Sequence, residues 1–112
     1  MALRGSDGAR RWLFSTIAFA KKRGFKENFH GVFSTPALAD VNHDGTLEIG
    51  FGSLDRNVYL LNSNGKPRYY YNAADTVWSS PAFTNVDDDP DLEMIIGTDI
   101  SRNDKLNPKT IN

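Results

Sequence analysis

A duplicated stretch decides the fold. Residues 34–53 read STPALADVNHDGTLEIGFGS, and residues 79–98 read SSPAFTNVDDDPDLEMIIGT, so the two segments align without gaps 45 residues apart. Eight of the 20 aligned positions are identical, and several of the others exchange an acid for an amide or one apolar residue for another. A period of this length is typical of chains built from repeated supersecondary units.

A second, weaker internal similarity extends the repeat pattern toward the N-terminus. Residues 6–14 (SDGARRWLF) resemble residues 63–71 (SNGKPRYYY) at a distance of 57 residues. The two distances differ by 12 residues, which predicts an insertion of that length between Thr16 and Val32. The insertion contains the basic run Lys21–Lys26, for which a solvated loop is the simplest interpretation.

Each unit carries strand signals rather than helical ones. Ser63–Asn64–Gly65 is a hairpin signal, and apolar or tyrosine-rich runs bounded by turn residues surround it. Helical periodicity is nowhere sustained. We expect strands at Phe33–Ala39, Leu47–Ser53, Val58–Leu61 and Arg68–Asn72.

Four short antiparallel strands in about 45 residues are typical of a β-propeller blade. The sequence therefore predicts an all-β fold, a propeller fragment of about two four-stranded blades. A blade buries its faces only against neighbouring blades, and closed propellers need about four or more. The chain is accordingly interpreted as part of a longer propeller or a truncated reading frame, with self-assembly of a partial propeller as the less favoured alternative. The expected parts are the last strands of a preceding blade (1–16), an insertion or linker (17–31), a complete blade (32–72), and the first strands of the next blade with a C-terminal tail (73–112).

The loop between the first two strands of the complete blade has the chemistry of a calcium site. Calcium takes six to eight oxygen ligands in flexible geometry, and alternate residues of a tight loop can converge on one side. Gly45 permits the sharp turn, because it can adopt a positive φ. The position where an EF-hand requires a glutamate is Phe51, so an EF-hand is rejected. The candidate ligands are Asp40, Asn42, Asp44, Thr46 through its backbone carbonyl, and Glu48.

The equivalent loop of the second segment is more acidic but lacks the glycine. Pro90 replaces it, and proline cannot supply a left-handed turn. Carboxylates this close repel one another, and a divalent cation would relieve the repulsion. Both loops also have a metal-free interpretation, since Asp and Asn side chains in tight turns often only accept backbone N–H bonds. The candidate ligands here are Asn85, Asp87, Asp89, Asp91 and Glu93.

The motif Ser-x-Pro-Ala-x-x-Asp-x-Asn-x-Asp-Gly-x-x-Glu-Ile-x-x-Gly resembles the FG-GAP (VCBS-type) repeat over about residues 32–99. The resemblance implies a propeller similar to the integrin α-chain head, with Ca²⁺ in the inter-strand loops. Carried over by position, the ligands fall on Asp40, Asn42, Asp44, Thr46 and Glu48. Glu48 departs from the pattern, because aspartate is commoner there. The resemblance also implies an extracellular or cell-surface location, with the periplasm as an alternative.

Composition excludes several functions. The net charge is −1, so the chain lacks the excess of basic residues that is typical of a nucleic-acid binder. No cysteine is present, which rules out disulfides, thiolate zinc sites and a cysteine nucleophile. The longest apolar runs are four residues, too short for a membrane span. His30 and His43 have no nucleophile at a recognised spacing, so we predict no catalytic residues.

Two functional hypotheses follow. The first is a non-enzymatic, calcium-stabilised propeller segment for adhesion, binding or scaffolding, whose partners are the remaining blades and a protein or carbohydrate ligand. The alternative is part of a propeller enzyme, such as a quinoprotein dehydrogenase or polysaccharide lyase, with an active site outside this chain. The small or apolar residues expected on the inner strands favour the binding module.

Two further features of the sequence can each be interpreted in two ways. Trp12, Trp78 and the Tyr69–Tyr71 run suit packing between blades better than a sugar-stacking surface. Arg10–Arg11 followed by Trp12–Ala20 resembles a signal peptide ending in small residues, although the similarity to residues 63–71 explains the start of that stretch as a strand.

Overall fold

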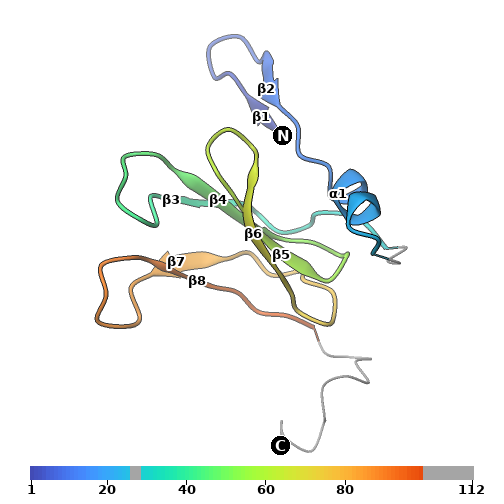
Figure 1. The fold of residues 1–112 in the computed structure, drawn as a ribbon. Helices are drawn as coiled ribbons and strands as arrows, with labels where there is room; N and C mark the ends of the chain where they lie inside the picture. The colour runs from blue at the N-terminus through green and yellow to red at the C-terminus, as the bar shows by residue number, and fades with distance from the viewer. Residues whose placement is uncertain (26–28, 100–112) are drawn as a thin grey trace, which may run out of the picture.

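The computed structural model describes residues 1–25 and 29–99, and the described part is mostly β (Figure 1). All strands pair antiparallel, in three sheets of order β1-β2, β3-β4-β5-β6 and β7-β8. The elements are β1 (Ala2–Leu3), β2 (Arg10–Trp12), α1 (Thr16–Lys22), β3 (Ala37–Ala39), β4 (Glu48–Gly52), β5 (Asn57–Leu61), β6 (Pro67–Asn72), β7 (Ala82–Thr84) and β8 (Glu93–Ile95). The predicted all-β class is confirmed at this level. The described strands close no ring, so the propeller stays a prediction.

The four-stranded sheet matches the expected strands closely, except at its first strand. Short turns join β4 to β5 and β5 to β6, and Gly65 adopts a φ of 82° in the β5–β6 turn. The expectation of a strand starting at Phe33 is wrong, because β3 begins only at Ala37. The preceding backbone is bonded by side chains instead: the Thr35 N–H donates to Ser80 Oγ at 2.8 Å, and Pro36 has no N–H to offer.

The β7–β8 hairpin reproduces the β3–β4 hairpin. Ala37 faces Gly50 in the first pair, and Ala82 faces Ile95 in the second, so the register is the same 45 residues later. The duplicated segments therefore fold alike where the structure describes them.

The N-terminal hairpin resembles the β5–β6 turn. Gly8 has a φ of 73°. The Ala9 N–H donates to Asp7 Oδ1, as the Lys66 N–H does to Asn64 Oδ1, both at 3.0 Å. The weaker internal similarity in the sequence thus corresponds to a similar local turn.

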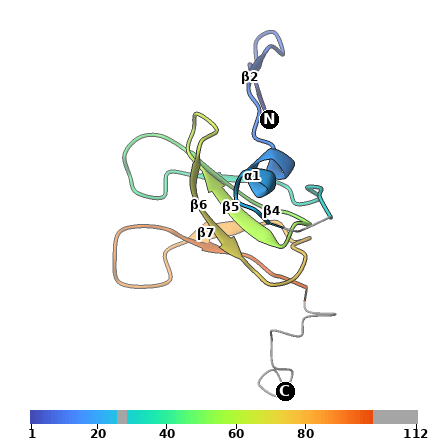
Figure 2. The ribbon, with the colours of Figure 1, turned by 45° about the vertical axis from the view of Figure 1, so that its right-hand side comes forward.

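The four-stranded sheet has a partner on each face, although the face toward α1 is left exposed at Leu38 of β3 (Figure 2). On one face Gly50 lies against Phe83 and Met94 of the β7–β8 hairpin. On the other face lies the apolar core of Phe51, Tyr59 and Leu61, packed against side chains of the N-terminal segment and α1. Burial of this apolar area is the main stabilising contribution.

Helix α1 differs from the expectation of an insertion or linker over residues 17–31. Ser15 caps it by accepting the Ala18 N–H on its side-chain oxygen at 3.2 Å. Phe19 then packs on the tyrosine rings of the sheet at centroid distances of 5.5 Å for Tyr59 and 5.1 Å for Tyr70. Tertiary packing thus stabilises a seven-residue helix that is too short to show a periodic pattern. No helix among the described residues is long and apolar enough to cross a membrane.

Candidate metal site in the acidic loops

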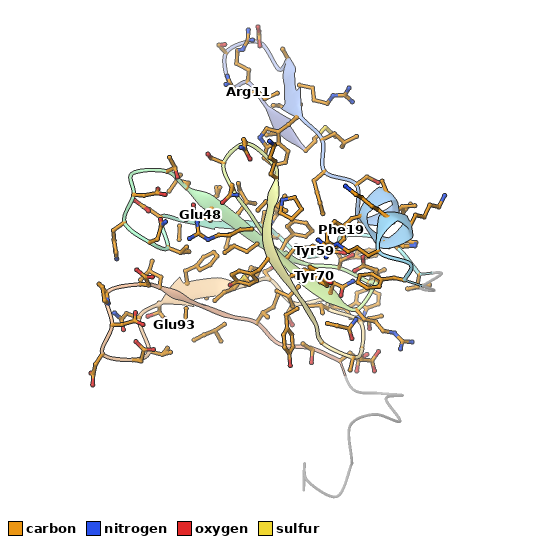
Figure 3. All side chains as sticks on the ribbon, viewed as in Figure 1. Arg11, Phe19, Glu48, Tyr59, Tyr70 and Glu93 are labelled. Atoms are coloured by element: carbon orange, nitrogen blue, oxygen red, sulfur yellow. The ribbon has the colours of Figure 1, made fainter. Side chains whose placement is uncertain are left out.

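The two acidic loops lie side by side at one end of the molecule, away from α1 (Figures 1 and 2). The Leu92 N–H donates to the Val41 carbonyl at 2.9 Å. His43 Nε2 donates to the Pro90 carbonyl at 2.5 Å. Glu48 and Glu93 lie at matching positions, each at the end of its loop and the start of the following strand, β4 or β8 (Figure 3). The loops are therefore one connected surface rather than two separate turns.

The loops share a hydrogen-bonded framework. The Val41 N–H donates to Glu48 Oε2 at 3.0 Å, and the equivalent Val86 N–H donates to Glu93 Oε2 at 2.8 Å. Asp44 Oδ1 accepts the Thr46 N–H, and Asp89 Oδ1 accepts the Asp91 N–H, both at 2.8 Å. Each glutamate thus ties the end of its loop back to its start.

The carboxylates of the first loop are largely occupied by backbone donors. Asp40 accepts the Asp44 N–H at 3.0 Å and the Gly45 N–H at 2.8 Å, one on each oxygen. The Thr46 hydroxyl donates to Asp44 at 2.6 Å. Hydrogen bonds from the Thr46 side chain and backbone hold the pKa of Asp44 below its usual value, so this exposed carboxylate is anionic at neutral pH. Gly45 adopts the predicted positive φ, 88°.

Glu48 has a basic neighbour that the sequence did not reveal. Its buried carboxylate has Oε1 3.8 Å from the Arg68 guanidinium, which reaches over from β6. An opposite charge beside the carboxylate offsets part of the attraction for a cation. Among the described residues, the carboxylates of Asp40, Asp44 and Glu48 form no three-membered group within reach of one ion.

One oxygen of the first loop is nevertheless open to a cation. Asn42 Oδ1 is buried and accepts no hydrogen bond from the described part of the chain, while its amide group donates to Asp44 at 3.1 Å. A buried carbonyl oxygen without a donor is costly, and a bound cation or water would satisfy it.

In the second loop, three carboxylates converge. Asp87, Asp89 and Glu93 each present an oxygen atom within 4.8 Å of the others, so they could hold a metal ion. Asn85 and Asp91 lie outside this group. Asn85 accepts the Asp87 N–H at 3.2 Å and donates to the Asp89 carbonyl, and Asp91 is exposed.

The two loops differ at their first candidate ligand. Asn85 stands where the first loop has Asp40, and its amide donates to one backbone carbonyl instead of accepting two N–H bonds. Glycine made the first loop the stronger candidate in the sequence. In the structure the second loop brings three carboxylates together, although each of them also accepts one backbone N–H.

The group has the chemistry of a hard cation site. Three carboxylates supply oxygen ligands only, and this donor set suits Ca²⁺, Mg²⁺ or Mn²⁺ rather than softer metals. No protein-family model matches the chain, and no curated protein matches it either.

Proposed function

We propose that this chain is a Ca²⁺-binding β-repeat module of the FG-GAP (VCBS) type, a propeller segment that serves adhesion, binding or scaffolding outside the cell. The observation that supports it is the group of Asp87, Asp89 and Glu93 in a duplicated acidic loop. Calcium is favoured over magnesium because calcium accepts six to eight oxygen ligands in flexible geometry, which suits an exposed loop. Magnesium demands near-ideal octahedral geometry. Loose sites of this kind bind calcium at about 10⁻⁴–10⁻³ M, as extracellular modules do.

The test compares two neighbouring carboxylates. Asp89→Asn removes a member of the group, and Asp88→Asn makes the same charge change at an exposed residue outside it. Calcium at about 100 times its Kd stabilises a folded protein by about 2.7 kcal/mol. We expect calcium to raise the Tm of the wild type and of Asp88→Asn by several degrees over a chelator control, and to leave Asp89→Asn nearly unchanged. Calorimetric unfolding with and without calcium measures this.

Two results would contradict the proposal. One is an unchanged wild-type Tm in calcium at about 100 times the expected Kd, about 10⁻²–10⁻¹ M. The other is an equal response of Asp88→Asn and Asp89→Asn, which would mean that calcium acts through overall charge. A matched magnesium titration distinguishes the two ions, since we expect magnesium to produce the smaller shift.

The stoichiometry of binding decides whether the first loop also holds calcium. The free Asn42 Oδ1 supports a second ion there, and the capping bonds of Asp40 oppose it. Isothermal titration of the wild type and of Asp40→Ala separates the cases. Two ions falling to one in the variant support the first loop as a site, and one ion in both proteins restricts binding to the second loop.

A further inference from the structure

The two duplicated segments contact each other through a defined set of residues. A Cβ added at Gly52 would lie 2.3 Å from Val77 Cγ1, and one added at Gly50 would lie 2.6 Å from Met94 Sδ and 2.8 Å from Phe83 Cζ. The rings of Phe33 and Trp78 are 5.0 Å apart between centroids. The first segment therefore offers a receiving face (Phe33, Gly50 and Gly52), and the second inserts side chains into it (Val77, Trp78, Phe83 and Met94).

Because the two segments repeat 45 residues apart, each of these two sets of contact residues has a counterpart on the other segment. The counterparts of the inserting residues are Val32, Phe33, Leu38 and Ile49 on the first segment. The counterparts of the receiving residues are Trp78, Ile95 and Gly97 on the second segment. Most of these residues are open to solvent: the exposed fraction is 48% for Val32, 67% for Phe33, 62% for Leu38, 50% for Trp78 and 51% for Ile95. Ile49 is partly buried, because its inner side packs against the core.

We propose that a second copy of this chain covers these surfaces. The outer face of one copy's β7–β8 hairpin packs on Val32, Leu38 and Ile49 of the next copy, in the same way as the two segments pack within one chain. The contact continues an interface already present in the molecule, which is the reason for choosing a second copy as the partner. Because the two surfaces differ, the contact is heterologous, and it produces a closed ring or an open filament.

The side-chain sizes at the two interfaces compensate. Within the chain, a glycine (Gly50) receives two large side chains, Phe83 and Met94. Between copies, Ile95 takes the place of the glycine and meets the smaller Leu38 and Ile49. The summed side chains differ by about one heavy atom, and cores accept swaps that conserve total volume.

The other two contacts between copies pair the same kinds of residue as the contacts within the chain. Gly97 remains a glycine opposite Val32, as Gly52 is opposite Val77. Trp78 meets the free face of Phe33, which continues the stack of aromatic rings from one copy to the next. Aromatic pairs of this kind contribute about 0.5–1.5 kcal/mol beyond their buried area.

There is room for the incoming hairpin. A cavity of about 400 Å³ is lined by Ile49 together with Val32, Pro36, Trp12 and Phe14. The adjoining surface around Leu38 is exposed, and α1 does not cover it. Filling an apolar space of this kind removes a large apolar area from water, which favours association.

The test uses two variants that each block one surface. Leu38→Glu removes the inserting half, and Ile95→Glu removes the receiving half. We expect the wild type to self-associate with concentration over about 1–100 µM in analytical ultracentrifugation, and each variant alone to remain monomeric. Mixed in equal amounts, the variants keep one intact surface each and form a complex of two chains that grows no further. Leu3→Glu, an equally exposed leucine on β1, should associate like the wild type.

Several outcomes would overturn the proposal: a monomeric wild type throughout this range, variants that associate like the wild type, or a mixture that stays monomeric although both variants are folded by circular dichroism. Should Leu38→Glu fail to fold, Val32→Glu blocks the same surface. The contact uses none of the metal-binding carboxylates, so the ultracentrifugation of Asp89→Asn must match the wild type. Failure of the calcium site and failure of self-association are therefore separately visible.

Discussion

Tyr59 shows how single residues shape the centre of the sheet. Its ring is fully buried, and its hydroxyl donates to Asp55 Oδ2 at 2.5 Å and accepts from Asn57 Nδ2 at 3.3 Å. Asp55 and Asn57 are buried too, and the Asn57 N–H donates to Asp55 Oδ1 at 3.2 Å. Buried polar groups require hydrogen-bond partners. The side chains of Asp55, Asn57 and Tyr59 provide them for one another and so stabilise the β4–β5 turn on its buried side.

This network predicts a loss of stability at alkaline pH. Burial, and then the hydrogen bond to Asp55, raise the pKa of Tyr59 well above its usual value of about 10. Since the folded pKa exceeds the unfolded one, the stabilisation is complete below pH about 10 and declines above it. We expect the free energy of unfolding to fall above that pH in the wild type, and less steeply in Tyr59→Phe. Urea unfolding at a series of pH values measures both slopes.

The control for this experiment is Tyr71→Phe, because Tyr71 is the most exposed large side chain of β6. It should keep the wild-type pH dependence. At neutral pH, Tyr59→Phe should also lose about 1–3 kcal/mol, since it leaves the buried Asp55 carboxylate with one donor fewer. Identical alkaline slopes in the wild type and Tyr59→Phe would show that the tyrosine does not carry the effect.

Residue-scale prediction from the sequence succeeded where the chemistry is local. The positive φ of Gly45 follows from residue type and spacing, and so does the metal-free alternative for Asp40, in which its carboxylate accepts backbone N–H bonds. The approach of Arg68 to Glu48 does not, because it joins β6 to β4 across the sheet. Which loop gathers three carboxylates also depended on exact side-chain directions, which spacing alone leaves open.

Among the elements, α1 contributes through one aromatic side chain. Phe19 lies among the rings of Phe14, Tyr59 and Tyr70, with centroid distances of 5.1–5.6 Å. The Arg23 guanidinium lies 4.9 Å from the Phe19 centroid and 5.1 Å from that of Tyr70. Edge-to-face rings and a cation over their faces hold the helix on the sheet.

We therefore expect Phe19→Ala to destabilise the protein by about 2–3 kcal/mol, less than a fully buried phenylalanine would, because the ring is only partly buried. Chemical denaturation measures the loss. Ile17→Ala, on the exposed side of the same helix, should cost far less. Equal effects of the two substitutions would mean that the aromatic cluster does not anchor α1.

Strands were more predictable than the helix, and the reason is physical. A strand or hairpin leaves a mark within a few residues, such as Asn64–Gly65 between apolar runs. A helix of two turns leaves almost none, and α1 exists because residues from β5 and β6 cover its apolar side. The start of β3 was missed for the same reason, since Ser80 supplies the bond that ends the ladder there.

For the molecule as a whole, glycines set the distance between the two β3–β4-type hairpins. Gly52 has Val77 so close that an added Cβ would also lie 2.9 Å from Val77 Cβ and 3.1 Å from its backbone carbonyl oxygen. That oxygen belongs to the main chain and cannot move aside cheaply. The packing of the two sheets therefore depends on the absence of a side chain at this position.

Gly52→Ala should cost about 1–3 kcal/mol through overpacking. The matched control is Gly5→Ala, where an added Cβ meets no atom within 4 Å. Thermal and urea unfolding of both variants measure the difference. A fully stable Gly52→Ala would show that the hairpins can separate without loss, and would weaken the case for the same contact between copies.

The sequence by itself determined that this is a β protein, where its hairpins turn, and which loops carry clustered acidic side chains, because strand alternation, turn chemistry and duplication are written in neighbouring residues. Only the tertiary structure decided that a helix covers one face of the central sheet, that the second loop gathers the carboxylates, and that each duplicated segment leaves one face open. Those outcomes depend on contacts between residues far apart in the chain, whose energies local patterns do not contain.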